Sequence, residues 1–172
     1  MLKKLTTNII HLNPSKKLNL ILKLSFFISS SMLISALYLQ YFEDVLPCDL
    51  CITQRWFHVA IILYSLIMIL ILRVQLIHMK LVVLGIALVW LFSGFAGMYH
   101  FGIELKLWAG PDTCTSNISF SKDLLQHLLN KSPIKCDEVM FKIFDISLAG
   151  WNAIVSIMIS LFTCVLLVKK GF

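Results

Sequence analysis

The sequence has 172 residues, of which 59% are hydrophobic and only 14% are charged, and its formal net charge is +6. So few charged residues, together with a mean hydropathy of +0.87, exclude an ordinary water-soluble domain and indicate a membrane protein. The length fits a single integral membrane domain, which we expect to span residues 1–172.

Four apolar segments follow one another along the chain, and none of them contains Asp, Glu, Lys or Arg. Each is close to the ~20 residues that a helix needs to cross a bilayer, where the backbone must satisfy its own hydrogen bonds. The first segment could be a cleaved signal peptide, but it is too long and no small-residue cleavage site follows it. We therefore expect an all-α membrane protein with a four-transmembrane-helix bundle. The predicted helices cover residues 24–42, 56–72, 81–99 and 146–168.

The basic residues predict the orientation of this bundle. Residues 1–23, the short loop 73–80 and the chain after the fourth segment carry nine basic and no acidic residues. The predicted loops 43–55 and 100–145 carry the other six basic residues and all nine acids. The positive-inside rule therefore predicts cytoplasmic termini and two periplasmic loops in a bacterial inner membrane. Because topology accounts for the charge, we expect contact with membrane lipid and no nucleic-acid partner.

The second periplasmic loop contains one segment with helical spacing. Phe120, Leu124, Leu125 and Leu128 share one helical face, and Ser121 can cap its start. A short helix of this kind fits either the membrane surface or a small core of the loop's own.

The predicted topology sorts the five cysteines. Cys48 and Cys51 lie in the first periplasmic loop. Cys114 and Cys136 lie in the second, whereas Cys164 lies within the fourth segment, as expected for a small packed residue. All four loop cysteines thus face the compartment in which disulfides persist. The residues by themselves leave three possibilities open: two static disulfides, a four-cysteine zinc site, or two exchanging redox pairs.

The sequence around the first cysteine pair favours redox chemistry. Pro47 suits the first turn of a helix, which would place Cys48 and Cys51 at the N-terminus of the second helix. The helix dipole stabilises a thiolate there, although the Asp49 carboxylate should raise nearby thiol pKa values slightly. Arg55 follows Cys51 by four residues and shares its face of the helix. Arg55 would either anchor the helix end or support a thiolate and the polar head of a ligand.

Four sequence elements resemble the disulfide bond formation protein B (DsbB) family. They are PCDLCITQR (Pro47–Arg55), YHFGIELKLWAGPDTC (Tyr99–Cys114), Cys136 and SLAGWNA (Ser147–Ala153). The resemblance covers about residues 20–168. It implies a quinone-dependent thiol:disulfide oxidoreductase that reoxidises a periplasmic DsbA-like protein of the thioredoxin fold. The electrons would pass to membrane quinone, either ubiquinone or menaquinone.

The resemblance also implies a role for each catalytic cysteine. Cys114 would form the mixed disulfide with the partner, and Cys136 would resolve it. Cys48 and Cys51 would reoxidise that pair, with a Cys51 thiolate facing the quinone ring. Arg55 would contact a quinone carbonyl. Exchange between the pairs requires their approach, so the second loop should move between the partner and the CxxC.

Two further positions follow from the same resemblance. His100 would belong to the quinone site, while a lone histidine there also fits the membrane interface. Gln54 stands where some members of the family carry an acid.

Two alternatives remain open. One is a four-helix quinone reductase resembling the vitamin K epoxide reductase family, although there the CxxC lies near the last helix and here it precedes the second. The other is a non-catalytic membrane protein with structural disulfides or zinc. In the oxidoreductase interpretation we expect no bound metal.

Overall fold

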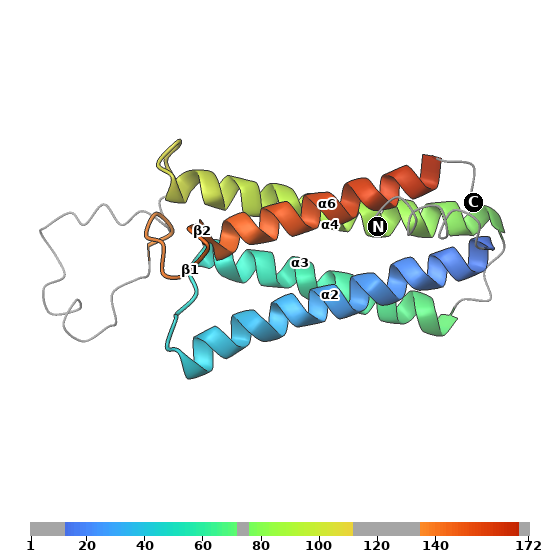
Figure 1. The fold of residues 1–172 in the computed structure, drawn as a ribbon, viewed down its shortest axis with the longest axis horizontal. Coiled ribbons are helices and arrows are strands. Elements are labelled where there is room, and N and C mark those ends of the chain that lie inside the picture. The colour runs from blue at the N-terminus through green and yellow to red at the C-terminus, as the bar shows by residue number, and fades with distance from the viewer. Residues whose placement is uncertain (1–12, 72–75, 112–134, 169–172) are drawn as a thin grey trace, which may run out of the picture.

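Four long helices lie side by side in the computed structural model, which describes residues 13–71, 76–111 and 135–168 (Figure 1). The helices are α2 (Pro14–Phe42), α3 (Asp49–Ile71), α4 (Leu76–Glu104) and α6 (Leu148–Val168). All four are long and apolar enough to cross a membrane. The predicted all-α bundle of four transmembrane helices is therefore confirmed, and the protein is a multi-pass membrane protein.

Three of the helices extend beyond the predicted apolar segments. Helix α2 begins at Pro14, α3 begins at Asp49, and α4 continues to Glu104. The sequence prediction found only the charge-free part of each helix, whereas helical hydrogen bonding continues where polar side chains reach the membrane surface. As a result, Arg55 and His100, at the edges of the predicted loops 43–55 and 100–145, are helical residues, and Cys51 lies in the first turn of α3.

A short β-hairpin, which the sequence analysis did not predict, precedes α6. Strands β1 (Lys142–Ile143) and β2 (Ile146–Ser147) pair antiparallel. Phe144 and Asp145 form the turn with positive φ angles of 50° and 62°, as two-residue hairpin turns require. Ser147 then caps α6, because its Oγ accepts a hydrogen bond from the Gly150 N–H at 3.1 Å. The helix predicted around residues 120–128 lies outside the described residues.

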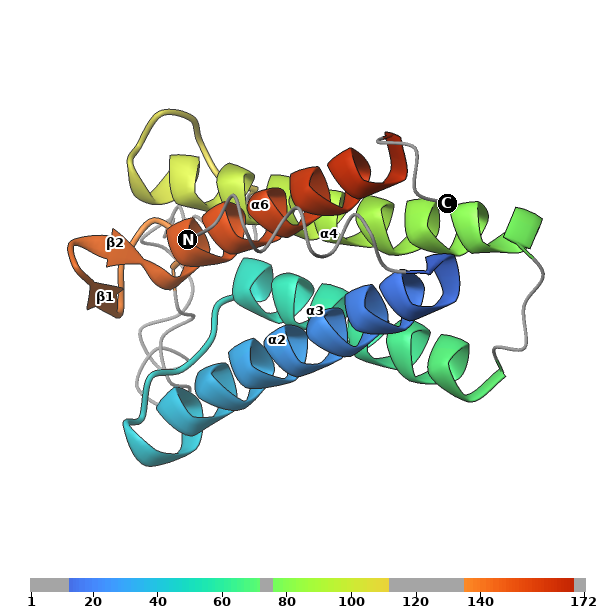
Figure 2. The same ribbon diagram turned by 45° about the vertical axis from the view of Figure 1, so that its right-hand side comes forward.

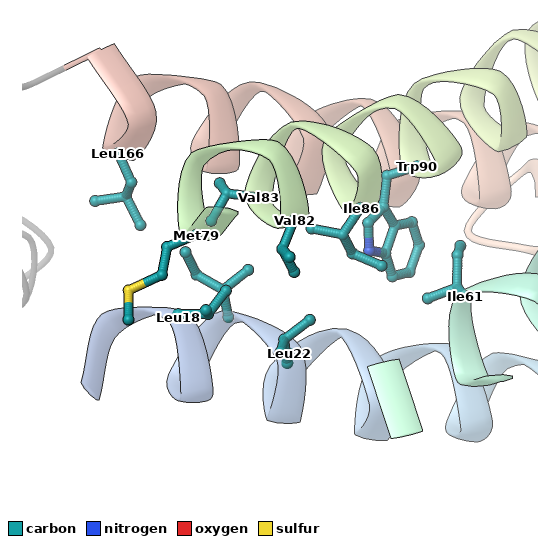
Figure 3. Close-up of a cluster of buried hydrophobic side chains, with 10 residues drawn as sticks. Leu18, Leu22, Ile61, Met79, Val82, Val83, Ile86, Trp90 and Leu166 are labelled. Carbon is teal, nitrogen blue, oxygen red and sulfur yellow. The ribbon is translucent and has the colours of Figure 1, made fainter. Parts of the chain in front are cut away.

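The hairpin and the α2–α3 linker lie at the same end of the bundle (Figures 1 and 2). We call this the loop end. At the other end, apolar side chains of α2, α4 and α6 form a buried cluster that includes Leu18, Leu22, Val83 and Leu166 (Figure 3). The cluster packs these helices together at the end of the bundle that lies away from the loop end.

Small and polar residues occupy much of the interior, while large apolar side chains face outward. Phe27 and Leu70, for example, are 66% and 75% exposed. Lipid is as apolar as these side chains, so helices in a membrane associate through close packing and hydrogen bonds. The buried hydroxyl residues are Ser25, Ser29, Ser65, Ser93, Ser147, Ser156, Ser160 and Thr163.

Gly97 lies at a close approach of α4 to α6. A Cβ atom there would lie 2.8 Å from the Ala153 nitrogen and 3.0 Å from the Ala149 oxygen. Both neighbours are backbone atoms of α6, which cannot rotate away. The small residue therefore lets the two helix backbones pack directly.

We expect Gly97→Ala to lower the free energy of unfolding by about 1–3 kcal/mol, because the added methyl group forces the two backbones apart. Thermal unfolding of the full chain in detergent measures the effect. Met98→Leu, a change on the exposed face of the same helix, is the control. Equal melting temperatures for the two variants would contradict this packing argument.

Candidate redox site at the loop end

Cys48 occupies the N-cap position of α3. Its carbonyl accepts a hydrogen bond from the Ile52 N–H at 3.0 Å, and its Sγ accepts one from the Cys51 N–H at 3.3 Å. The two cysteines are therefore at the helix N-terminus, as predicted, but Pro47 precedes the cap and is not in the first turn. The two thiols are free, and their sulfur atoms lie 3.1 Å apart.

The pKa of the Cys48 thiol is lowered well below its ordinary value. The hydrogen bond from the Cys51 thiol is the main cause, followed by a contact from His100, and together they outweigh the burial that raises it. Asp49 is exposed at the first position of α3, so its charge meets water and the helix dipole. Asp49 is not among the causes of the shift in the pKa of its neighbour Cys48. In this reduced pair Cys51 is the hydrogen-bond donor.

Cys136 brings the second loop to the CxxC. It is 1% exposed and disulfide-bonded, and it packs in a small cluster with Cys48 and Ile103. The Cys48 sulfur, the Cys136 sulfur and a ring nitrogen of His100 all lie within 4.8 Å of one another. Two cysteines that lie far apart in the chain thus meet at one point. Cys114 lies outside the described residues, and its pairing stays a prediction.

His100 lies inside the bundle beside these sulfurs. It is 2% exposed, and its Nε2 is 3.5 Å from the Cys48 Sγ and 3.9 Å from a carboxylate oxygen of Glu104. On the other side of the ring, Nδ1 is 2.8 Å from the Gln54 amide nitrogen. Glu104 in turn accepts a hydrogen bond from the Ser147 hydroxyl that caps α6. Helices α3, α4 and α6 are therefore linked around Cys48.

Arg55 reaches from α3 to the end of α2. Its guanidinium donates to the Ala36 carbonyl at 3.1 Å and to the side-chain oxygen of Gln40. Cys51 and Arg55 face the same pocket, as the four-residue spacing predicted. The pocket has an apolar wall on α2 and a polar wall on α3 and α4. Its lining includes Ala36, Leu39, Leu46, Cys48, Cys51, Arg55, His100, Glu104 and Met140.

The same cluster offers the ligand types of a metal site. Cys48, His100 and Cys136 could each direct one atom at a common centre. A zinc ion needs thiolate sulfurs, however, and the disulfide-bonded Cys136 has none to donate in this state. Cys164 is a free thiol in α6 and does not line the pocket.

Three residues beside the site were missed as functional candidates by the sequence analysis, or noted only in passing. Gln54, His58 and Asn152 are buried within helices that are otherwise apolar. Polar residues inside a membrane-spanning helix are rare and point inward. Gln54 and His58 are four residues apart, and this pattern could have predicted a buried polar face on the second helix.

The lowered pKa of Cys48 predicts that its reactivity persists in mild acid. Cys48 loses its thiolate form only when the pH falls through its lowered pKa. The alkylation rate of an ordinary thiol with a pKa near 8.5, by contrast, falls about tenfold for each pH unit below that value. Alkylation of Cys48 at pH 6 should therefore be within about threefold of its rate at pH 8. Mass spectrometry of the alkylated full chain measures this. A tenfold fall per unit at Cys48 would contradict the geometry.

The comparisons with known proteins agree with the redox geometry. The family model described as "Disulfide bond formation protein DsbB" matches residues 18–166, which is most of the chain. No curated protein and no solved structure gives a significant match. A membrane bundle with a CxxC at a helix start is consistent with this family. The chain belongs to the DsbB family of disulfide bond formation proteins.

Proposed function

We propose that this protein reoxidises a periplasmic DsbA-like thiol oxidase of the thioredoxin fold and passes the electrons to membrane quinone. The family supports the oxidoreductase class. The observation that carries the finer proposal is the approach of Cys48 and Cys136, whose sulfur atoms lie within 4.8 Å. Thiol–disulfide exchange needs direct contact between sulfurs, so we assign the exchange between the two loops to Cys48 and Cys136.

The exchange balances in three steps. The partner's dithiol reduces the Cys114–Cys136 disulfide through a mixed disulfide at Cys114, and the partner leaves as a disulfide. The Cys136 thiolate then attacks Cys48 of an oxidised CxxC, which breaks the Cys48–Cys51 bond and releases Cys51 as a thiolate. Finally Cys114 attacks Cys136, which restores the loop disulfide and leaves Cys48 and Cys51 reduced. That product matches the redox state of the described cysteines.

In this series of reactions Cys51 has two different protonation states. In the reduced pair its sulfur lies 3.1 Å from the Cys48 sulfur, and its thiol donates to Cys48 in the thiolate form that the lowered pKa of Cys48 favours. While Cys48 is bonded to Cys136, Cys51 has lost that acceptor and is the leaving thiolate. It then faces the pocket that it shares with Arg55. The predicted Cys51 thiolate therefore belongs to the intermediate, when charge is released beside the guanidinium.

The pocket has the chemistry that a quinone head group needs. Ala36 and Leu39 supply an apolar wall, and Arg55 has guanidinium N–H groups beyond the two donated to α2. Bound there, ubiquinone or menaquinone would take up the two electrons and two protons that are released when the CxxC disulfide closes. Arg55 would orient a carbonyl oxygen, and His100 borders the same pocket through its contact with Cys48.

The orientation of the bundle completes the proposal. The loop end carries all the described cysteines except Cys164, so it faces the oxidising periplasm. Lys16, Lys17 and Lys80 at the other end then face the cytoplasm, and the positive-inside rule assigns both termini to the same side. A bacterial inner membrane satisfies both conditions and supplies lipid-soluble quinone.

Purified full-length protein should reduce quinone anaerobically when a reduced thioredoxin-fold oxidase is the donor. Cys51→Ser should lower the rate at least ~1000-fold, because the CxxC disulfide cannot form without it. Cys164→Ser is the matched control and should keep the wild-type rate. Wild-type activity in Cys51→Ser would refute the proposal. Cysteines that stay oxidised whatever the quinone supply, or bound zinc in the purified chain, would favour the structural alternative.

Arg55→Met should raise the KM for quinone by roughly ten- to hundredfold, which corresponds to the loss of one hydrogen bond from a charged donor. Arg55→Lys should recover part of this loss, since it keeps the charge but not the planar fork. Lys23→Met removes an exposed charge of α2 away from the pocket and serves as the control. An unchanged KM in Arg55→Met would place the quinone elsewhere.

A further inference from the structure

A continuous series of hydrogen bonds links Cys48 to the middle of the bundle. His100 contacts Gln54, whose Oε1 accepts from the Asn152 amide at 2.7 Å. The Asn152 Oδ1 lies 3.1 Å from the His58 Nε2, and the His58 Nδ1 lies 3.0 Å from the Ser29 hydroxyl. The series therefore uses side chains from all four described membrane helices.

These groups are deeply buried. Gln54, His58 and Asn152 are 7%, 5% and 4% exposed. Two amides and an imidazole inside a membrane bundle are costly unless every polar atom has a partner. Helix association alone could use hydroxyl groups, as Ser160 does when it donates to the Ala87 carbonyl at 2.9 Å. The composition of the series therefore calls for an explanation beyond packing.

The direction of the series is fixed at Asn152. Its amide nitrogen lies 3.4 Å from the Ser93 carbonyl, which can only accept a hydrogen bond. The hydroxyl of Ser156 donates to Asn152 Oδ1 at 2.9 Å. The amide therefore has one consistent orientation, with its nitrogen toward Gln54. The same orientation makes the His58 Nε2 a donor to Oδ1.

This orientation determines the tautomer of His100. Because the Gln54 oxygen accepts from Asn152, its amide nitrogen must donate to the His100 Nδ1. A neutral imidazole that accepts at Nδ1 carries its hydrogen on Nε2. Nε2 is the atom that faces the Cys48 Sγ at 3.5 Å. From His58 to His100 the donors thus point toward one sulfur, and aligned hydrogen bonds strengthen one another; the Ser29 hydroxyl donates to the His58 carbonyl.

We propose that Gln54, Asn152 and His58 are positioning residues that hold the Nε2–H tautomer of His100 toward Cys48. The role deepens the proposed function, because it keeps the sulfur that meets Cys136 ready for exchange. The three residues act through His100 and do not line the pocket. With the opposite amide orientation, a bare Nε2 lone pair would face the sulfur.

Other groups also act on Cys48 and stay unchanged in the test. Cys51 donates from α3, and Glu104 lies beside His100 on α4. The segment before β1 contributes the disulfide-bonded Cys136 to the cluster. The charged residues that line the pocket with Cys48 are Arg55, Glu104, Lys135 and Glu138.

The test is the pH dependence of Cys48 alkylation in the full-length, detergent-purified chain, resolved by mass spectrometry. Asn152→Leu and Gln54→Met should each raise the apparent pKa of Cys48 by about one to two units, as expected for a weakened hydrogen bond to a charged sulfur. The double variant should shift no further than Gln54→Met alone, because both act along one route. Ser160→Ala, which removes a buried α6–α4 hydrogen bond outside the series, should cause no shift.

A second substitution that restores the Cys48 titration distinguishes a positioning role from a role in folding. In the Asn152→Leu background, Gln54→Glu should return the Cys48 titration toward the wild-type value, since either carboxylate oxygen accepts from Nδ1–H of an imidazolium whose Nε2–H remains. A purely structural role predicts no such return. If Asn152→Leu does not fold, Asn152→Ser takes its place with the same expectation.

The proposal would be overturned if the apparent pKa of Cys48 in Asn152→Leu equals that in Ser160→Ala. Additive shifts of this pKa in the double variant would also overturn it. The assay uses neither quinone nor a partner protein. Its outcome is therefore independent of whether the quinone-coupled reaction occurs.

Discussion

Three donors converge on the sulfur of Cys48, and the rest of the loop end is arranged around them. The Cys51 N–H and thiol come from the first turn of α3, and the imidazole of His100 comes from α4. The helix N-terminus adds its dipole to these contacts. An anionic sulfur is thus stable in a site that is nearly closed to water. Glu104 and the Ser147 cap join the ends of α4 and α6 beside this site.

The lipid environment explains how such a site can be built from so short a chain. Apolar side chains gain little by meeting one another when lipid is equally apolar, so the interior is free to hold glycine, serine and amides. Gly97 lets α4 and α6 touch through their backbones, and Asn152 sits one turn from the start of α6 facing the same helix. The contacts that join the helices are therefore the same contacts that orient the site.

In the proposed function, the separation of the cysteines into two pairs follows from the two phases that the protein would connect. A water-soluble partner would be met on a loop, while a lipid-soluble oxidant would be met within the bilayer. Cys136 belongs to the loop and Cys48 to the start of a membrane helix, and their sulfurs share one cluster. Arg55 lies one turn deeper than Cys51 and is tied to α2. Charge released at the pair thus has a cation nearby on the membrane side.

The sequence by itself determined the four membrane helices, because charge-free segments of sufficient length have one stable form in lipid. It also predicted that Cys48 and Cys51 begin a helix and that Arg55 shares the face of Cys51, since both follow from local spacing. It did not predict the hairpin, whose turn uses Phe144 and Asp145 in place of glycine or asparagine. The link between Gln54 and Asn152 joins residues 98 positions apart, which no local pattern encodes. Only tertiary packing decided which buried polar groups meet, because each must find its partner on another helix.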